Sequence, residues 1–446
     1  MKVLLIYTNR FRFLSPPPSG LAYLVNPLKE QGHDVRVLDL MFAKKPIAEI
    51  EKALQAFEPA LVGFSIRNLD NESMLELQNP LLEIKEFVTV VKNHGITTVL
   101  GGVAFTTLPR EMLAYMGADY GIAGQGEESL PSLVSALESG ADVTGIPGLV
   151  YRDGSTVLMS SPPVIKGYGA GVRADWSAID LKPYKKNAII APPGVVVVKI
   201  GCPFQCTYCD AKNTMGSIHI FRSPEDIIEE IRAVKNAHHI HNFFLADSCF
   251  NSPLDKAKDL LRTMIDAKLK IRFMLRCNPF HDGFDEEFFT LLKRAGGYCI
   301  SSSIDSFSDT MLENYRKPFR TADIIEFGEL ARHHGISFIA ELLFGGPGET
   351  NETIRESMAL LPRVEFSRLE YAIGVRINPG TAVFDAAVKT GVVSDASELL
   401  FAKFYISREV DVEWAKKFID QNIKKFSSRN WRMLPMIMRN VKDAII

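Results

Sequence analysis

The sequence predicts an α/β protein made of two successive sheet units and a C-terminal helical segment. Over residues 1–145, short apolar runs alternate with segments of helical periodicity, which is typical of a Rossmann-like, doubly wound parallel sheet. The alternation resumes over residues 192–385 with six apolar runs, which predicts a partial (β/α)6 barrel that is open at one side. Residues 386–446 show helical spacing of apolar residues and are expected to form a helical C-terminal region.

The first unit begins with a buried strand and a helix that ends at Gly32, where a helix-terminating glycine is expected. Ligands of such sheets bind beyond the carboxyl ends of the strands, so the loops that follow the strands are expected to line one crevice. The strands are predicted at Val3–Tyr7, Val35–Leu38, Leu61–Ile66, Thr97–Leu100 and Tyr120–Ala123, with the first helix at Ser19–Gln31.

Residues 146–191 are rich in proline and glycine and are expected to form a linker with a small hairpin of Gly148–Tyr151 and Thr156–Met159. The six barrel strands are predicted at Val195–Ile200, Asn242–Ala246, Ile271–Leu275, Cys299–Ile304, Ser337–Leu343 and Leu369–Val375. The intervening helices are predicted at Pro224–Ala237, Leu254–Ala267, Asp285–Ala295 and Ala322–His334.

Composition narrows the class of function. The chain has 446 residues, 51 Lys and Arg against 53 Asp and Glu, and a formal charge of −2, so it has no basic field for nucleic acid. The first strand passes directly into polar residues and does not resemble a targeting peptide, and no apolar stretch is long enough to span a membrane. Six cysteines in a chain of this size do not indicate a disulfide framework. We therefore expect a cytoplasmic protein.

Cys202, Cys206 and Cys209 follow an apolar strand within a stretch of eight residues. Three thiolates on one short loop can hold a cubane [4Fe–4S] cluster and leave one iron open for a ligand. The alternatives are a structural zinc site and a disulfide pair. Zinc usually takes four protein ligands from paired knuckles, and no second pair is present in the sequence, so the cluster is favoured. Cys249, Cys277 and Cys299 are expected to be small buried residues.

The C-x3-C-x2-C spacing, with an aromatic residue before the last cysteine, resembles the signature of the radical S-adenosylmethionine (SAM) superfamily. Further matching stretches are Phe243–Asn251, Ser303–Ser306, Leu343–Thr350 and Gly374–Thr381. The resemblance implies that the open iron binds SAM. Glu349 is interpreted as a structural carboxylate near a helix N-terminus, with a catalytic acid as the alternative, and Thr350 or Asn351 is expected to cap that helix. Arg376 is interpreted either as a carboxylate ligand or as part of a salt bridge. The SAM-binding residues that the resemblance implies are Tyr208, Asp247, Ser248, Asp305, Gly345, Gly346, Pro347 and Arg376.

The first unit resembles the cobalamin-binding domain of class B radical SAM enzymes, through Pro17–Leu24, Gly32–Val35, Leu100–Val103 and Gly124–Glu127. It lacks the histidine that ligates cobalt in methionine synthase-type domains, since His33 and His94 precede strands and are expected to face solvent. Arg67 is assigned to the lower face of cobalamin, which the missing histidine leaves vacant, although a guanidinium cannot ligate cobalt. The alternative is that Arg67 pairs with Asp70. The cobalamin-binding residues implied are Ser19, Gly20, Arg67, Asn68, Gly101, Gly102, Val103, Gly124, Gln125, Gly126 and Glu127.

Together these motifs resemble the tryptophan 2-C-methyltransferase and P-methyltransferase branch of the class B enzymes. The resemblance implies methyl transfer from SAM through methylcobalamin to an unactivated carbon, or a phosphinate phosphorus, of a small molecule. It also implies an external electron donor of the flavodoxin or ferredoxin type. No catalytic side chain is assigned. The alternatives are a radical SAM cyclase or oxidase that does not transfer methyl, and a non-catalytic iron–sulfur or zinc protein. The C-terminal segment, with Trp414, Phe418, Trp431 and Met433–Met438, is expected to form a lid over the barrel mouth.

Overall fold

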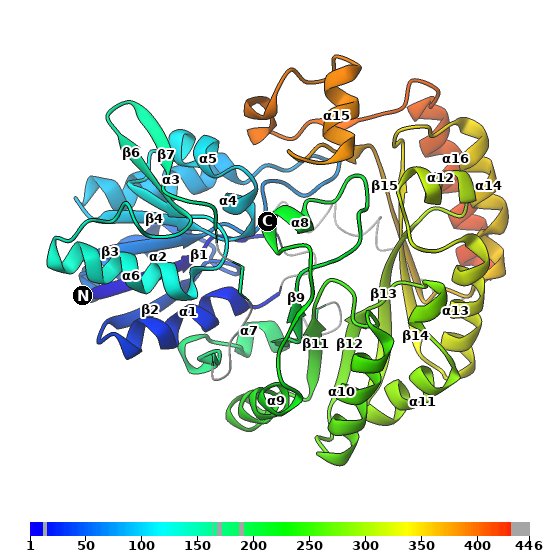
Figure 1. The fold of residues 1–446 in the computed structure, drawn as a ribbon, viewed down its shortest axis with the longest axis horizontal. Helices are drawn as coiled ribbons and strands as arrows, with labels where there is room; N and C mark the ends of the chain where they lie inside the picture. Colours follow the sequence, from blue (N-terminus) through cyan, green and yellow to red (C-terminus); the bar gives the residue numbers. More distant parts are fainter. Residues whose placement is uncertain (12–15, 164, 167–171, 187–190, 430–446) are drawn as a thin grey trace.

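The computed structural model describes residues 1–11, 16–163, 165–166, 172–186 and 191–429. Two sheets, the first mainly parallel and the second parallel, lie on opposite sides of the molecule, and the short helix α8 (Ala211–Thr214) lies between them (Figure 1). One continuous apolar core contains residues of both sheets, among them Val3 and Leu5 of the first and Phe243 and Leu275 of the second. The two units are therefore packed as one body rather than joined only by a linker.

In the described residues the first sheet has seven strands in the order β2-β1-β3-β4-β5-β6-β7. Five of the six side chains of β1 are buried, as expected for a central parallel strand covered on both faces. The strand order reverses between β1 and β3, and this is the switch point at which open α/β sheets bind ligands. The elements are β1 Lys2–Tyr7, α1 Ser19–Glu30, β2 Asp34–Asp39, α2 Pro46–Phe57, β3 Leu61–Ser65, α3 Leu81–Asn93, β4 Thr97–Gly101, α4 Val103–Thr107, α5 Pro109–Met116, β5 Tyr120–Ile122, α6 Gly126–Ser139, β6 Leu149–Asp153 and β7 Thr156–Met159.

The hairpin predicted in the linker is β6 and β7, and it does not stand apart. The strand β6 pairs antiparallel with β5, so the hairpin extends the edge of the first sheet. Short antiparallel pairing lets the chain cover that edge without another crossover helix.

The second sheet has six parallel strands in the order β8-β11-β12-β13-β14-β15, and the two outer strands do not pair with each other in the described residues. This is the predicted partial barrel. Its elements, with the short pieces before and after it, are α7 Lys182–Lys185, β8 Gly194–Val197, β9 Lys199–Ile200, β10 Ile220–Phe221, α9 Pro224–His238, β11 Asn242–Ala246, α10 Leu254–Asp266, β12 Arg272–Arg276, α11 Glu286–Ala295, β13 Gly297–Asp305, α12 Asp309–Asn314, α13 Thr321–His333, β14 Ser337–Phe344, α14 Asn351–Leu360, β15 Arg368–Ile373, β16 Val375–Arg376, α15 Ala382–Lys389, β17 Phe404–Tyr405 and α16 Val412–Arg429.

The C-terminal region differs from the expectation of one helical lid. The strand β17 pairs antiparallel with β16, and α16 lies along α14 on the outer side of the barrel (Figure 1). Trp414 stacks on Phe418 with ring centroids 4.9 Å apart, and Arg355 of α14 lies 4.7 Å from the Trp414 ring centroid. The apolar face of α16 is thus used against a barrel helix and not over the barrel mouth. Trp431 and Met433–Met438 lie outside the described residues. In the part of the chain that the structure describes, no helix has the length and apolar character needed to cross a membrane.

Two buried polar contacts join the units. Arg376 of β16 donates from Nε to Asp70 Oδ2 at 2.9 Å, and both side chains are almost fully buried. On the other side, Tyr23 of α1 donates to Glu230 of α9 at 2.9 Å, and Arg222 pairs with the same carboxylate at 2.7 Å. Such charges lose their hydration on burial, so each requires its partner to stay in place.

Replacing Arg376 by Met should leave Asp70 buried without a cation and should lower the free energy of unfolding by about 3–5 kcal/mol. The double variant R376M/D70L should recover most of this loss, because it removes both charges. Urea unfolding of the three proteins measures the effect. The matched control is R262M, which breaks an exposed pair with Glu287 and should cost less than about 1 kcal/mol. Equal losses in R376M and R262M would contradict the assignment.

Candidate functional site

The three cysteines lie on the loop between β9 and α8, and their thiols are free and half-buried. The loop is held by backbone hydrogen bonds from Cys202 N–H to the Gly216 carbonyl at 3.0 Å and from Thr207 N–H to the Tyr315 carbonyl at 3.1 Å. It starts at Gly201, whose φ is +86° and where a Cβ would lie 1.8 Å from the Ile218 carbonyl oxygen. Only glycine fits there, so this residue sets the entry of the cysteine loop. Cys249, Cys277 and Cys299 are buried, as predicted.

Tyr208 and Asp305 are brought together by a lysine that sequence reasoning missed. Tyr208 donates to Asp305 Oδ2 at 2.6 Å, and Lys317 Nζ lies 2.7 Å from the same oxygen. Although desolvation opposes it, the carboxylate of Asp305 raises the pKa of Lys317 and keeps it cationic. The only sequence signal for Lys317 is its alternation with Tyr315 and Phe319, which indicates a buried position. Asp305 therefore attaches Tyr208, and with it the cysteine loop, to the end of β13, and its Oδ2 is already engaged.

Asp247 and Ser248 follow β11 and reach the start of the same loop. Ser248 donates to the Gly201 carbonyl at 2.5 Å. Lys199 Nζ lies 2.9 Å from Asp247 Oδ2, whereas Asp247 Oδ1 is buried and has no hydrogen-bond partner within the described residues. Desolvation raises the pKa of Asp247 to about 6, and the charge of Lys199 opposes this rise. A buried acceptor without a donor is costly, so this atom fits a ligand that supplies an N–H or O–H.

The glycines after β14 are required by packing within the protein. At Gly345, whose φ is +93°, a Cβ would lie 2.8 Å from Ile406, and at Gly346 it would lie 2.4 Å from Tyr315. The Gly346 N–H donates to the Tyr315 hydroxyl at 3.2 Å. The loop with Pro347 then leads into α14, which is capped by the Thr350 side chain as predicted.

Glu349 has the structural role that was expected. It is fully buried and accepts from Thr353 Oγ1 at 2.5 Å and from Gly345 N–H at 3.3 Å.

Arg376 is not available to a SAM carboxylate. Besides its contact with Asp70, it donates from Nη2 to the Leu399 carbonyl at 3.1 Å and from Nη1 to the Ile377 carbonyl. Nε joins the two units through Asp70, while Nη1 and Nη2 bind carbonyls that follow the barrel, so of the two interpretations the salt bridge is correct. The partner is on the first unit, because β16 lies at the junction and not inside the barrel.

The residues assigned to cobalamin follow β3, β4 and β5 or begin α1, so they lie at the carboxyl edge of the first sheet. This set is Ser19, Gly20, Arg67, Asn68, Gly101, Gly102, Val103, Gly124, Gln125, Gly126 and Glu127. At Gly102, whose φ is +97°, a Cβ would lie 2.5 Å from the Ile66 carbonyl oxygen. The Val103 side chain is 46% exposed, so this edge presents an apolar contact surface. Glu127 Oε2 is buried without a partner in the described residues.

Arg67 does not pair with Asp70. It donates to Asn68 Oδ1 at 3.0 Å. Burial raises the pKa of Tyr7, at the end of β1, to about 12, and the charge of Arg67 opposes this rise. Arg67 therefore lies at the β1/β3 switch point. His94 is exposed, as expected, but His33 is buried at the opposite end of the sheet beside the chain's first amino group, so the expectation for His33 was wrong. Neither histidine lies near the carboxyl edge.

One contact joins the cysteine loop to this edge directly. Thr107 at the end of α4 donates from Oγ1 to Asp210 Oδ2 at 2.9 Å, and Asp210 follows Cys209 in the chain. The strand-end loops of both sheets therefore meet at one place, which Figure 1 shows around α4 and α8.

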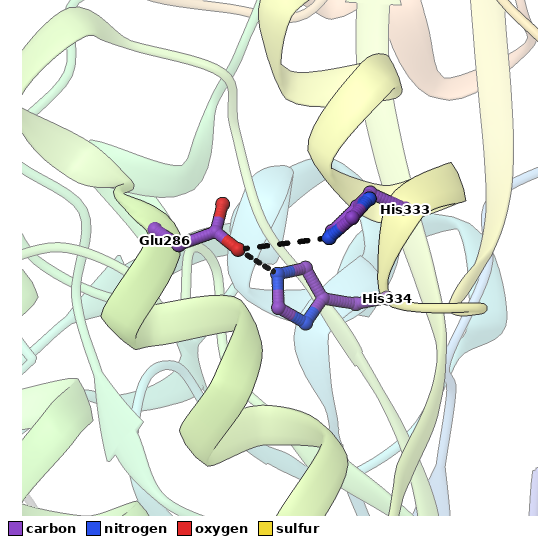
Figure 2. A group of neighbouring side chains, drawn as sticks. All are labelled: Glu286, His333 and His334. Carbon is purple, nitrogen blue, oxygen red and sulfur yellow. Dashed lines mark hydrogen bonds and ion pairs between the residues drawn. The ribbon is translucent and has the colours of Figure 1, made fainter.

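A second group with metal-ligating side chains lies elsewhere. Figure 2 shows Glu286 at the start of α11 facing His333 and His334 at the end of α13, with His334 Nε2 2.8 Å from Glu286 Oε1. Two of these residues are exposed, and the group lies on the outer helices of the barrel. We treat it as a surface ion-pair group.

Comparison with known proteins agrees with this geometry. Residues 13–134 match the B12 binding domain family, and residues 196–361 match the radical SAM superfamily. The chain is a radical SAM protein with a B12-binding domain, and these families imply cobalamin, SAM and a [4Fe–4S] cluster. It is homologous to cobalamin-dependent radical SAM methyltransferases.

Among the relatives, the tryptophan 2-C-methyltransferase of Streptomyces laurentii is 26% identical over 82% of this chain and 71% of its own length. The cytidylyl-2-hydroxyethylphosphonate methyltransferase of Streptomyces wedmorensis is 22% identical over 92% of this chain and 85% of its own. The solved structure of the methyltransferase TsrM from Kitasatospora setae, with tryptophan and a SAM analogue, has a TM-score of 0.84 at 23% identity, covering 97% of this chain and 91% of that one, so the fold is shared.

Burial gives Glu349 a testable signature, because desolvation raises its pKa from 4.5 to about 7. Between these values the folded state holds a proton that the unfolded state releases, so this group's contribution to stability falls as the pH rises through that window. E349Q should therefore gain on the order of 3 kcal/mol relative to the wild type between pH 5 and pH 8.

Thermal unfolding of both proteins at several pH values measures this difference. E352Q, on the exposed side of the same helix, is the control and should show no pH-dependent difference. A pH-independent difference for E349Q would show that Glu349 is ionised in the folded protein throughout.

Proposed function

We propose that this protein is a cobalamin-dependent radical SAM methyltransferase that acts on a small molecule. The observation that carries the proposal is the meeting of the cysteine loop and the carboxyl edge of the first sheet through Thr107 and Asp210. Methyl transfer through cobalamin requires the cluster-bound SAM, the corrin and the substrate to be close together, and this arrangement supplies that proximity. The homologous methyltransferases support the same assignment.

Cys202, Cys206 and Cys209 are the proposed cluster ligands, because they are the half-buried thiols on one loop. The cluster, with SAM on its open iron, would supply radical chemistry, and cobalamin would supply the methyl group. The chain's own residues position these groups. Lys317 and Asp305 fix Tyr208 beside the cysteines, and the unpartnered Asp247 Oδ1 accepts a hydrogen bond from the SAM amine or ribose. The backbone after β14 and Ser248 complete the proposed SAM site.

Cobalamin is proposed to lie against the carboxyl edge of the first sheet. The exposed Val103 offers apolar contact to the corrin, and Glu127 Oε2 offers an acceptor to its amide side chains. Arg67 at the switch point would face the lower side of the corrin. A guanidinium has no lone pair for cobalt at neutral pH, so its charge opposes water ligation and higher cobalt charge without forming a bond.

The remaining partners follow from the chemistry. Reductive use of a cluster requires an external electron donor of the flavodoxin or ferredoxin type. Six free cysteines, three of them proposed as cluster ligands, suit a reducing compartment, and we propose the cytoplasm. Asp305, first assigned to SAM directly, is proposed here as the residue that positions Tyr208.

The function is tested with anaerobically reconstituted protein, methyl-labelled SAM and a small-molecule extract of the source cells. The wild type should transfer label to a small product and form S-adenosylhomocysteine. The variant with Cys202, Cys206 and Cys209 all replaced by Ala should lose the cluster, measured as iron per chain, and all SAM-dependent products, while α-helical content and unfolding temperature stay near wild type. C299A, which removes a buried thiol from β13, is the matched control. Formation of 5′-deoxyadenosine without S-adenosylhomocysteine or labelled product would favour a cyclase or oxidase.

The lower face of cobalamin is tested by electron paramagnetic resonance of bound cob(II)alamin. The wild type should show no nitrogen superhyperfine splitting from a protein ligand or from the tethered base. R67H places an imidazole at the same position and should introduce such splitting, which shows that the spectrum reports on this site. Splitting in the wild type, or failure to bind cobalamin, would overturn the assignment.

A further inference from the structure

The interior of the barrel carries four hydrogen-bonded polar side chains, which we call the barrel array: Arg276, Ser301, Ser303 and Glu341. Arg276 Nη2 donates to Ser303 Oγ at 2.6 Å and to Glu341 Oε2 at 2.8 Å. Ser303 donates to Glu341 Oε2 at 2.6 Å, and Ser301 to Oε1 at 3.2 Å. The array thus crosses β12, β13 and β14 on their inner faces.

This composition is unusual for a barrel interior, which is normally filled by bulky apolar side chains. Along these strands the outward residues, such as Leu275 and Leu342, are buried against the helices. The inward side chains of Arg276 and Glu341 are 38% and 32% exposed. They therefore face accessible space inside the barrel rather than a packed core.

The array lies next to the proposed SAM site. Ser303 of the array lies two residues before Asp305 on β13. The backbone carbonyl of Arg276 accepts at 2.7 Å from the N–H of Phe250, in the same loop after β11 as Asp247. Asp305 contacts Tyr208 of the cysteine loop, and Ser248, next to Asp247, contacts the start of that loop, so a molecule held by the array would have its other end toward the cluster and the corrin edge. This is the position that a substrate requires.

The array and its neighbours can bind both an anionic and a cationic group of a ligand. Within the described residues, Arg276 donates only from Nη2, so its Nε and Nη1 are open to an anion. Glu341 lies opposite Glu370 in the register of β14 and β15, and Glu370 forms an ion pair with Arg368. Desolvation raises the pKa of Glu370, Arg368 lowers it and the charge of Glu341 raises it. Two carboxylates so close together favour a cation between them. With Arg276 and Arg368 the set is neutral overall.

Two arginines and two glutamates with no net charge suit a zwitterionic ligand, which carries one positive and one negative group. A wholly apolar molecule would bury Arg276 and Glu341 against hydrocarbon and leave their open donors and acceptors unpaired. A phosphoryl dianion would meet one open arginine and the carboxylates Glu341 and Glu370. An α-amino acid satisfies both sides at once, with its carboxylate on the guanidinium and its ammonium on the carboxylates.

We propose that the barrel array binds the α-ammonium and α-carboxylate groups of a free amino acid, which is the methyl acceptor. Arg276 holds the carboxylate, and Glu341 with Glu370 holds the ammonium. The inference rests on the proposed function and names its substrate class. SAM carries the same two groups, so the experiment must separate the substrate from SAM as the occupant.

The test uses protein loaded with cluster and cobalamin under anaerobic conditions and saturated with a non-cleavable SAM analogue. Binding of each of the twenty protein L-amino acids is measured by equilibrium dialysis, so no methyl transfer is needed and failure here is distinct from failure of the labelled-methyl assay. For the amino acid that binds best, its decarboxylated amine and its deaminated acid are measured as well. R276Q and E341Q are compared with R262Q, which removes an exposed arginine of α10.

At least one amino acid should bind, and R276Q should weaken it about ten- to hundred-fold, as loss of a charge-assisted contact does. In R276Q the amino acid and its decarboxylated amine should bind equally, because the carboxylate has lost its partner. E341Q should weaken binding of the amino acid but not binding of the deaminated acid. This comparison tests the proposal independently if R276Q does not fold. R262Q should bind as the wild type does.

Affinity for the SAM analogue should stay within about two-fold in all variants. If R276Q or E341Q instead loses the SAM analogue, the array belongs to SAM and the proposal is wrong. Absence of binding by any of the twenty amino acids, or equal binding by wild type, R276Q and E341Q, would also overturn it.

Discussion

The site depends on the junction at which the carboxyl ends of two parallel sheets meet. Each sheet presents one row of strand-end loops, and the junction brings the two rows together. The buried pair of Arg376 and Asp70 holds one side of the junction, and Tyr23, Arg222 and Glu230 hold another. Buried ion pairs contribute little net stability, but they tolerate almost no displacement, because a separated charge would remain unsolvated. The junction therefore sets the relative position of the two units.

Contacts with both units at this junction fix the position of the cysteine loop. It is attached on one side to the first unit through Thr107 and Asp210, and on the other to the barrel through Tyr208, Asp305 and Lys317. The same loop thus touches the surface assigned to cobalamin and the surface assigned to SAM. Gly201 begins the cysteine loop, and Gly102 precedes α4, the helix that carries Thr107. Both have a positive φ, and a Cβ at either position would collide with a neighbouring carbonyl oxygen.

The barrel interior supplies the third side of the site. In the proposed substrate site, the half-exposed Arg276 and Glu341 recognise the substrate and are not among the residues that hold the cysteine loop. In the arrangement we propose, loops at the strand ends position the cofactors and inward side chains lower in the barrel distinguish substrates. Relatives with this fold act on chemically different molecules, which is consistent with specificity residing in the barrel wall.

Apolar periodicity in the sequence determined both sheets, because burying alternate strands and helix faces leaves few other arrangements. The spacing of Cys202, Cys206 and Cys209 determined the cluster loop, because three thiols so close in the chain stay close in any fold. Tertiary structure alone decided which charges meet. Arg376 pairs with Asp70 more than 300 residues away, Lys317 reaches Asp305, and α16 covers α14 instead of the barrel mouth. A charged side chain carries no local signal of its partner, since pairing is selected by desolvation in the folded protein and not by spacing along the chain.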